Sequence, residues 1–111
     1  MSTAEQLYDE AIELQQAGKL GEAVGKLESL IVDHADYALA HAALAVFYGK
    51  LGRQDEAIEH SQRVCQLEPD DPFSFMAMSL VCQRADRLPE AEQALRRAME
   101  KQWAGQRDTS N

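Results

Sequence analysis

The stretch LGRQDEAIEHSQRVCQLEPDD, from Leu51 to Asp71, has a close counterpart on either side of it in the chain. The segments AGKLGEAVGKLESLIVDHAD, from Ala17, and ADRLPEAEQALRRAMEKQWAG, from Ala85, align with it without a gap at a constant offset of 34 residues. Repetition at a fixed period of this length is typical of architectures in which stacked units bury one another. The predicted repeats cover about residues 4–37, 38–71 and 72–105 of a single domain, 1–111.

Two columns of this alignment hold small residues in every repeat. Two helices can cross closely only where their side chains are small, because larger ones would force the axes apart. Each repeat is therefore expected to be a pair of tightly crossed helices. The small columns are Ala11, Ala45 and Ser79 in the first helix, and Ala23, Ala57 and Ala91 in the second.

Turn and capping residues divide each repeat into its two helices. Gly52 interrupts the apolar pattern of the second repeat and tolerates a positive φ, and Pro69 stops its second helix. Asp71 is a good N-cap before Pro72, and Thr3 with Gln6 forms a capping-box pattern. The tail at residues 106–111 is expected to be flexible. The predicted helices cover residues 3–17, 20–33, 37–51, 54–67, 72–85 and 88–102.

The second repeat resembles the tetratricopeptide repeat, a helix–turn–helix unit of the same length. The resemblance rests on Leu44, Ala45, Tyr48, Gly52, Ala57, Leu67 and Pro69. The outer repeats depart from the family pattern at Glu10, Asp86 and Trp103, and the second departs from it at Ser61. The resemblance implies an all-α fold, a right-handed α-solenoid of three repeats and six helices, over about residues 4–105. It implies no particular ligand, because many functions share this scaffold.

The composition restricts the kind of partner. The formal net charge is −8, which argues against nucleic acid as the main partner, since phosphate contacts need clustered Lys and Arg. The start of the chain lacks the features of a secretory signal, and its most apolar run, 37–49, is too short to cross a bilayer and contains His41. We therefore expect a cytoplasmic protein without membrane insertion, in which Cys65 and Cys82 are buried thiols.

We find no catalytic constellation in the sequence. His34, His41 and His60 fall in different registers; His41 is expected on the packed side of its helix and His60 on a polar face. Cys65 and Cys82 lack the C-x-x-C spacing of a redox or zinc motif. The sequence therefore predicts a protein that is not an enzyme and that has no cofactor and no metal.

The resemblance implies that the first helix of each repeat lines a concave groove. Helical geometry then places on the groove side Ala43 and an apolar floor with a polar rim. The predicted partner-binding residues are Tyr8, Ile12, Leu39, Val46, Lys50, Phe73, Met76, Leu80 and Arg84. Because exposed apolar surface usually marks an interaction site, we expect a non-enzymatic scaffold that binds a partner peptide or helix.

Some tetratricopeptide proteins grip the acidic C-termini of heat-shock chaperones with Lys, Asn and Arg side chains on this concave face. The matching positions in this chain hold no basic or amide side chain, so the resemblance does not extend to that activity. They are Tyr8, Ile12, Ala43, Phe73 and Ala77.

The alternative function is self-assembly into a weak homo-oligomer. The charge is uneven: residues 1–37 carry eight acids and two bases, whereas residues 72–111 carry five acids and six bases. No additional helix covers the last repeat, which leaves Met99 and Trp103 as an oligomer contact. Head-to-tail stacking would bring Arg96, Arg97 and Lys101 near acids of another copy, such as Glu13 and Glu28.

Overall fold

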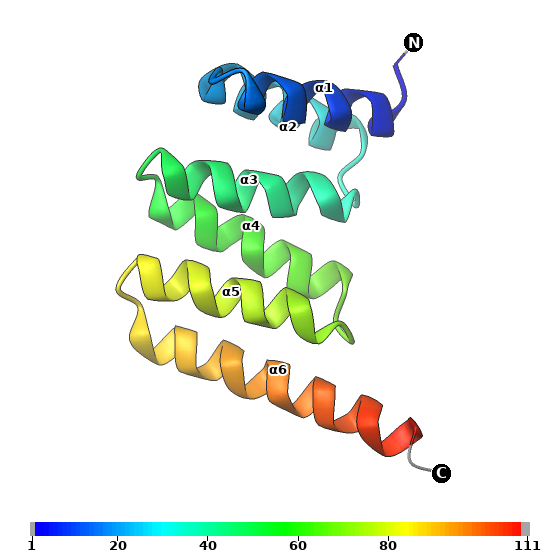
Figure 1. Cartoon of the computed structure of the whole chain (residues 1–111), viewed down its shortest axis with the longest axis vertical. Helices are drawn as coiled ribbons and strands as arrows, with labels where there is room; N and C mark the ends of the chain where they lie inside the picture. Colours follow the sequence, from blue (N-terminus) through cyan, green and yellow to red (C-terminus); the bar gives the residue numbers. More distant parts are fainter. Residues whose placement is uncertain (1, 110–111) are drawn as a thin grey trace.

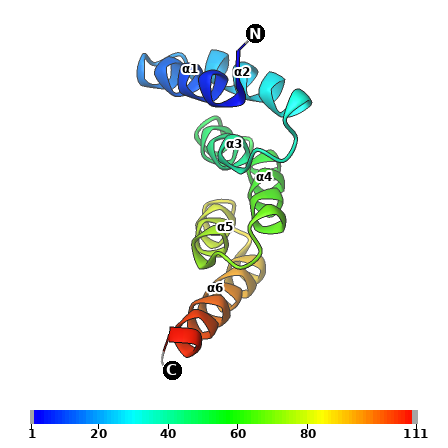
Figure 2. The same ribbon diagram turned by 90° about the vertical axis from the view of Figure 1, so that its right-hand side faces the viewer.

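The computed structural model describes residues 2–109, with side chains described as far as Ala104. The helices stack in sequence order along the longest dimension of a molecule of 46 × 33 × 22 Å (Figure 1). Seen from the side, α3 and α5 lie one above the other with α4 beside them, and α6 runs obliquely below α4 and α5 (Figure 2). The helices are α1 Ala4–Gln16, α2 Leu20–Asp33, α3 Ala38–Lys50, α4 Gln54–Leu67, α5 Pro72–Arg84 and α6 Leu88–Thr109.

The same closing turn ends the first helix of every repeat. The backbone N–H of Lys19 donates to the carbonyl of Leu14 (2.8 Å), that of Arg53 to Tyr48 (2.9 Å), and that of Arg87 to Cys82 (2.8 Å). The residue before each of these donors is left-handed: φ is 82° at Gly18, 78° at Gly52 and 59° at Asp86. The predicted role of Gly52 is therefore confirmed, and Asp86 adopts the same conformation without the freedom of glycine.

The predicted caps form as expected. The Thr3 hydroxyl accepts from the Gln6 N–H (3.1 Å) and the Gln6 side chain accepts from the Thr3 N–H (2.8 Å), which completes the capping box. The Asp71 carboxylate accepts from the Phe73 N–H (3.0 Å) at the start of α5, with Pro72 as the first helical residue. These contacts satisfy backbone donors that no helix could satisfy internally.

The two small columns lie where helices cross. All six of their side chains are buried, which confirms the predicted packing. The largest core cluster joins α1 to α4 around Leu27, Leu30 and Leu44, with Phe47 and Tyr48 beside them. Smaller clusters continue the core through α5 and α6, where Cys65 and Cys82 are buried free thiols, as expected.

Helix α6 is the element whose predicted length was wrong. The first five helices begin and end within one residue of the predicted bounds, but α6 continues to Thr109 instead of ending at 102. No proline follows residue 102, and Gly105 by itself does not end the helix. The tail predicted to be flexible, 106–111, is thus helical as far as 109, and residues 110–111 lie outside the described part.

Candidate partner-binding groove

One apolar column runs across the first helices of all three repeats. Ile12, Val46 and Leu80 occupy the same position in α1, α3 and α5, each separated by one repeat length. Val46 and Leu80 are exposed, and Ile12 is half-buried because it also packs against the largest core cluster. Each first helix therefore presents an apolar side chain at this position, which forms the apolar ladder of the stack, as helical periodicity within a fixed repeat requires.

A second column has its largest members in α3 and α5. Leu39 and Phe73 are both exposed, and the Phe73 side chain retains 72% of its accessible surface. In the first repeat the same column holds Glu5, which is also exposed. The apolar character of this column thus begins at the second repeat and increases toward the third.

Tyr8 and Met76, which the sequence analysis placed in the groove, are less exposed than the other large apolar groove residues of α3 and α5. Both are half-buried. The Tyr8 ring meets the Tyr37 ring edge to face at a centroid distance of 6.1 Å, and Met76 packs against the cluster of Cys65 and Phe75. These two side chains contribute to the core as well as to the surface.

Two basic side chains form part of the predicted polar rim of the groove. Lys50 and Arg84 share a column, are exposed, and lie in the last turns of α3 and α5. The Lys50 ammonium lies 6.0 Å from the centre of the Phe47 ring.

Ala43, expected on the groove side, is buried in the largest core cluster, because the packed stripe of α3 is wide enough to include it.

Two of the three histidines, His41 and His60, form a packed pair that the sequence analysis did not predict. His41 is 6% exposed; its Nε2 lies 2.7 Å from the Ala35 carbonyl and its Nδ1 lies 3.0 Å from Nδ1 of His60. The His60 ring stacks against His41 and Tyr48, with centroid distances of 5.2 and 5.5 Å. The prediction that His60 lies on a polar face was therefore wrong, because α3 packs against that side of α4.

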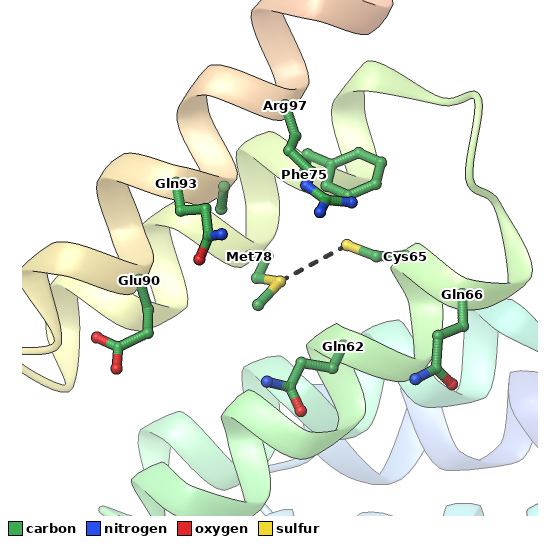
Figure 3. Close-up of a pocket in the computed structure, with 9 residues that line it drawn as sticks. Gln62, Cys65, Gln66, Phe75, Met78, Glu90, Gln93 and Arg97 are labelled. Carbon is green, nitrogen blue, oxygen red and sulfur yellow. Dashed lines mark hydrogen bonds between the residues drawn. The ribbon is translucent and has the colours of Figure 1, made fainter.

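A pocket of about 440 Å³ opens between α4, α5 and α6 (Figure 3). Cys65, Phe75 and Ala94 line it as buried side chains, with Met78 half-buried beside them. Burial raises the pKa of Cys65 to about 11, so this thiol is protonated at neutral pH. The other lining residues are Gln62, Gln66, Glu90, Gln93 and Arg97. Sequence reasoning missed this site; the one signal was alanine at position 94, where the second repeat has His60.

The outer side of α6 carries an exposed apolar stripe of Leu88, Leu95, Met99 and Trp103. In the first repeat Leu27 occupies the column of Leu95 and is 0% exposed, because the following repeat covers it; Leu95 is 43% exposed. Both predicted oligomer-contact residues, Met99 and Trp103, thus lie on a larger uncovered surface. Arg96 and Arg97 are exposed. Lys101 instead forms an ion pair within the chain, with its Nζ 3.7 Å from Oδ1 of Asp70.

The described part of the chain has neither a cluster of side chains suited to a metal ion nor a helix suited to crossing a membrane. Within it, no cluster of three or more His, Cys, Asp or Glu side chains is arranged to hold a metal ion. None of its helices is both long enough and apolar enough to cross a membrane.

Residues 38–71 match the sequence model of the tetratricopeptide repeat. No curated protein matches the chain significantly. Among solved structures, MamA is 22% identical, with a TM-score of 0.85 over 95% of this chain and 61% of that chain. A second MamA structure is 23% identical, with a TM-score of 0.82 over 89% of this chain. This chain spans only 54% of its length.

Two other similar structures are a domain bound to a peptide and a secretion chaperone. The second tetratricopeptide domain of Spaghetti (RPAP3), bound to the HSP90 peptide SRMEEVD, is 21% identical, with a TM-score of 0.77 over 86% of this chain and 89% of that one. SycD, a type III secretion translocator chaperone from Yersinia enterocolitica, is 25% identical, with a TM-score of 0.79 over 89% of this chain and 75% of that one. The family match thus identifies the second repeat, residues 38–71, as a tetratricopeptide repeat, and the six helices together share the fold of these solved structures.

Proposed function

We propose that the chain is a protein-interaction module that binds a partner peptide or helix in the groove formed by α1, α3 and α5. The observation that carries this proposal is the exposed apolar ladder of Val46 and Leu80 with Leu39 and Phe73 beside it. Exposed apolar side chains in contiguous columns usually mark an interaction site. Lys50 and Arg84 at the rim favour a partner segment with an acidic flank.

Similar proteins of this fold engage polypeptides. The RPAP3 domain holds an HSP90 peptide, and Scc3 forms a complex with CopN. In this chain the floor of the groove is apolar, so apolar anchors of the partner would supply most of the affinity. The proposed role is binding alone, without catalysis, in the cytoplasm.

The test uses a partner identified by affinity capture and mass spectrometry and then purified. Leu80→Asp and Phe73→Ala are expected to weaken its binding by about 2 kcal/mol or more, as loss of a buried anchor does. Isothermal titration calorimetry measures the change. Val32→Asp, an exposed apolar site on α2, and Glu59→Ala on α4 are the matched controls. Equal affinities for all four variants would contradict binding in the groove.

The stripe on α6 favours a second function, homo-oligomer formation. The α3 residues that share a cluster with Leu27 and Leu30 of α2 include Leu44 and Phe47. The same two columns in α1 hold Glu10 and Glu13, so the outer side of the first repeat is acidic and polar. Head-to-tail stacking would pair the Arg side chains of α6 with these acids. A symmetric contact between two α6 stripes would bury more apolar surface.

A further inference from the structure

The pocket between α4, α5 and α6, hereafter the α4–α6 pocket, lies on the side of the molecule away from the proposed groove. Phe75 and Met78 enter it from α5, whereas Phe73 and Leu80 of the same helix face the groove. Figure 3 shows the Cys65 and Met78 side chains at its floor, with their sulfur atoms 3.7 Å apart. The pocket is therefore a separate surface from the groove.

The repeat symmetry shows why the α4–α6 pocket exists. Position 94 corresponds to position 60 in the preceding repeat, and Phe75 corresponds to His41. At the earlier junction the His60 ring occupies part of the space by stacking on His41 at a centroid distance of 5.2 Å, and the pocket that remains beside it is smaller, about 290 Å³. At the later junction Ala94 has no side chain beyond its methyl group. Removing a ring from a packed site leaves a cavity wherever the surroundings do not collapse.

The walls of the α4–α6 pocket suit a planar aromatic group. Phe75 offers an aromatic surface, and the sulfur atoms of Cys65 and Met78 make favourable contacts with ring edges. The Arg97 guanidinium at the mouth can stack over a ring face. The equivalent space one repeat earlier already holds an aromatic ring, so the shape of the site is compatible with one.

The polar side chains at the mouth of the α4–α6 pocket indicate that such a ring would belong to a polypeptide. Gln62, Gln66 and Gln93 surround the mouth, and each carboxamide has both donors and an acceptor. A backbone peptide group has the same complement, so the rim can pair with the main chain on either side of an inserted side chain. Glu90 and Arg97 carry opposite charges and give the mouth no net charge that would select an ionic small molecule.

We propose that the α4–α6 pocket binds an aromatic side chain of a partner polypeptide, in the place that the His60 ring occupies at the preceding repeat junction. The site is independent of the groove proposed above, because no residue belongs to both.

The experiment follows the Met78 methyl group by NMR on the full chain labelled at methionine methyl carbons. The capped tripeptide Gly-Trp-Gly is titrated, with capped Gly-Leu-Gly and free indole as comparison probes. We expect a saturable upfield shift of the Met78 signal with the tryptophan peptide, caused by the ring current. We also expect affinity about tenfold weaker for the leucine peptide and for indole, since each lacks part of the contact.

Variants locate the binding. Ala94→His, which recreates the residue of the preceding repeat, is expected to weaken tryptophan-peptide binding by about tenfold or more. Ala94→Val, a smaller addition, should weaken it less and keeps the test valid if the larger side chain disturbs folding. Ser29→His on the exposed side of α2 and Leu80→Asp in the groove should leave it unchanged. Absence of a saturable Met78 shift, equal binding by Ala94→His, or indole binding as tightly as the peptide would each overturn the proposal.

Discussion

At the scale of single residues, the contact between His41 and His60 fixes a protonation state. Nε2 of His41 lies 2.7 Å from a carbonyl oxygen and must donate to it, so Nδ1 of a neutral His41 accepts from Nδ1 of His60. Only one of the two facing Nδ1 atoms can carry a hydrogen, because two N–H groups would otherwise point at each other. Burial lowers the pKa of His60, and His41 lowers it further, against the opposite effect of Glu59, Glu28 and Glu56.

The lowered pKa of His60 makes stability depend on pH. Below about pH 6.5, the ordinary histidine pKa, the unfolded chain binds a proton that the folded chain still excludes, so stability falls until the folded pKa is reached. Between about pH 7.5 and pH 5.5, His60→Phe should remove part of this loss, at most about 1.4 kcal/mol per pH unit for one proton. Urea unfolding measures it. His34→Asn is the control, and an unchanged slope in His60→Phe would contradict the prediction.

At the scale of elements, we expect helix α2 to be less stable than its counterpart α4. It contains Gly21 in its first turn and Gly25 in its interior, whereas α4 has no glycine. The first repeat also has a neighbour on one side only, and in a stack stability comes from neighbours. We therefore expect amide protons of residues 20–33 to exchange faster than those of 54–67.

Alanine at either glycine of α2 should stabilise the protein. A methyl group added at Gly21 or Gly25 meets no atom within 4 Å, so Gly25→Ala should raise the free energy of unfolding by about 1 kcal/mol through helix propensity, and Gly21→Ala, in the first turn, should raise it by less. Hydrogen exchange of residues 20–33 should slow in parallel. Gly52→Ala is the matched control: the space there is also open, but φ is 78°, so this substitution should destabilise. Stabilisation by Gly52→Ala would show that propensity is not the cause.

At the scale of the whole molecule, the two ends of the stack differ. The outer side of α1 carries Gln6, Glu10 and Glu13, whereas α6 carries the apolar stripe that includes Leu95 and Trp103. Solenoids remain soluble when their terminal repeats have a polar outer surface, and here only the first repeat has one. If copies of this chain associate as proposed above, we therefore expect the contact to use the α6 stripe.

Trp103→Asp should abolish self-association measured by sedimentation velocity, because it places a charge on the apolar stripe. Phe73→Asp in the groove is the control and should associate like the native chain. Raised salt separates the two geometries: head-to-tail contacts between charges weaken, whereas a contact between two apolar stripes persists. Association that survives Trp103→Asp would eliminate the α6 stripe as the contact.

The sequence by itself determined the repeat, the helix pairs and the closing turns. The reason is that these depend on local features: the 34-residue period, small residues in fixed columns, and Gly52 or Asp71 at turns and caps. It also located the exposed columns of Val46 and Leu80, since periodicity places them opposite the packed stripe. The end of α6 could not be predicted, because no proline follows position 102 and Gly105 and helix propensity are weak guides there.

Only the tertiary structure decided what each exposed or packed position contacts. The pairing of His41 with His60 requires α3 and α4 to lie side by side, and no local pattern encodes that distance. The α4–α6 pocket depends on three helices at once and on the absence of a ring at Ala94. Burial of Ala43 likewise follows from the width of the packed stripe. Contacts between repeats are set by the stacking of whole helices, so side chains far apart in sequence become neighbours only once the solenoid has formed.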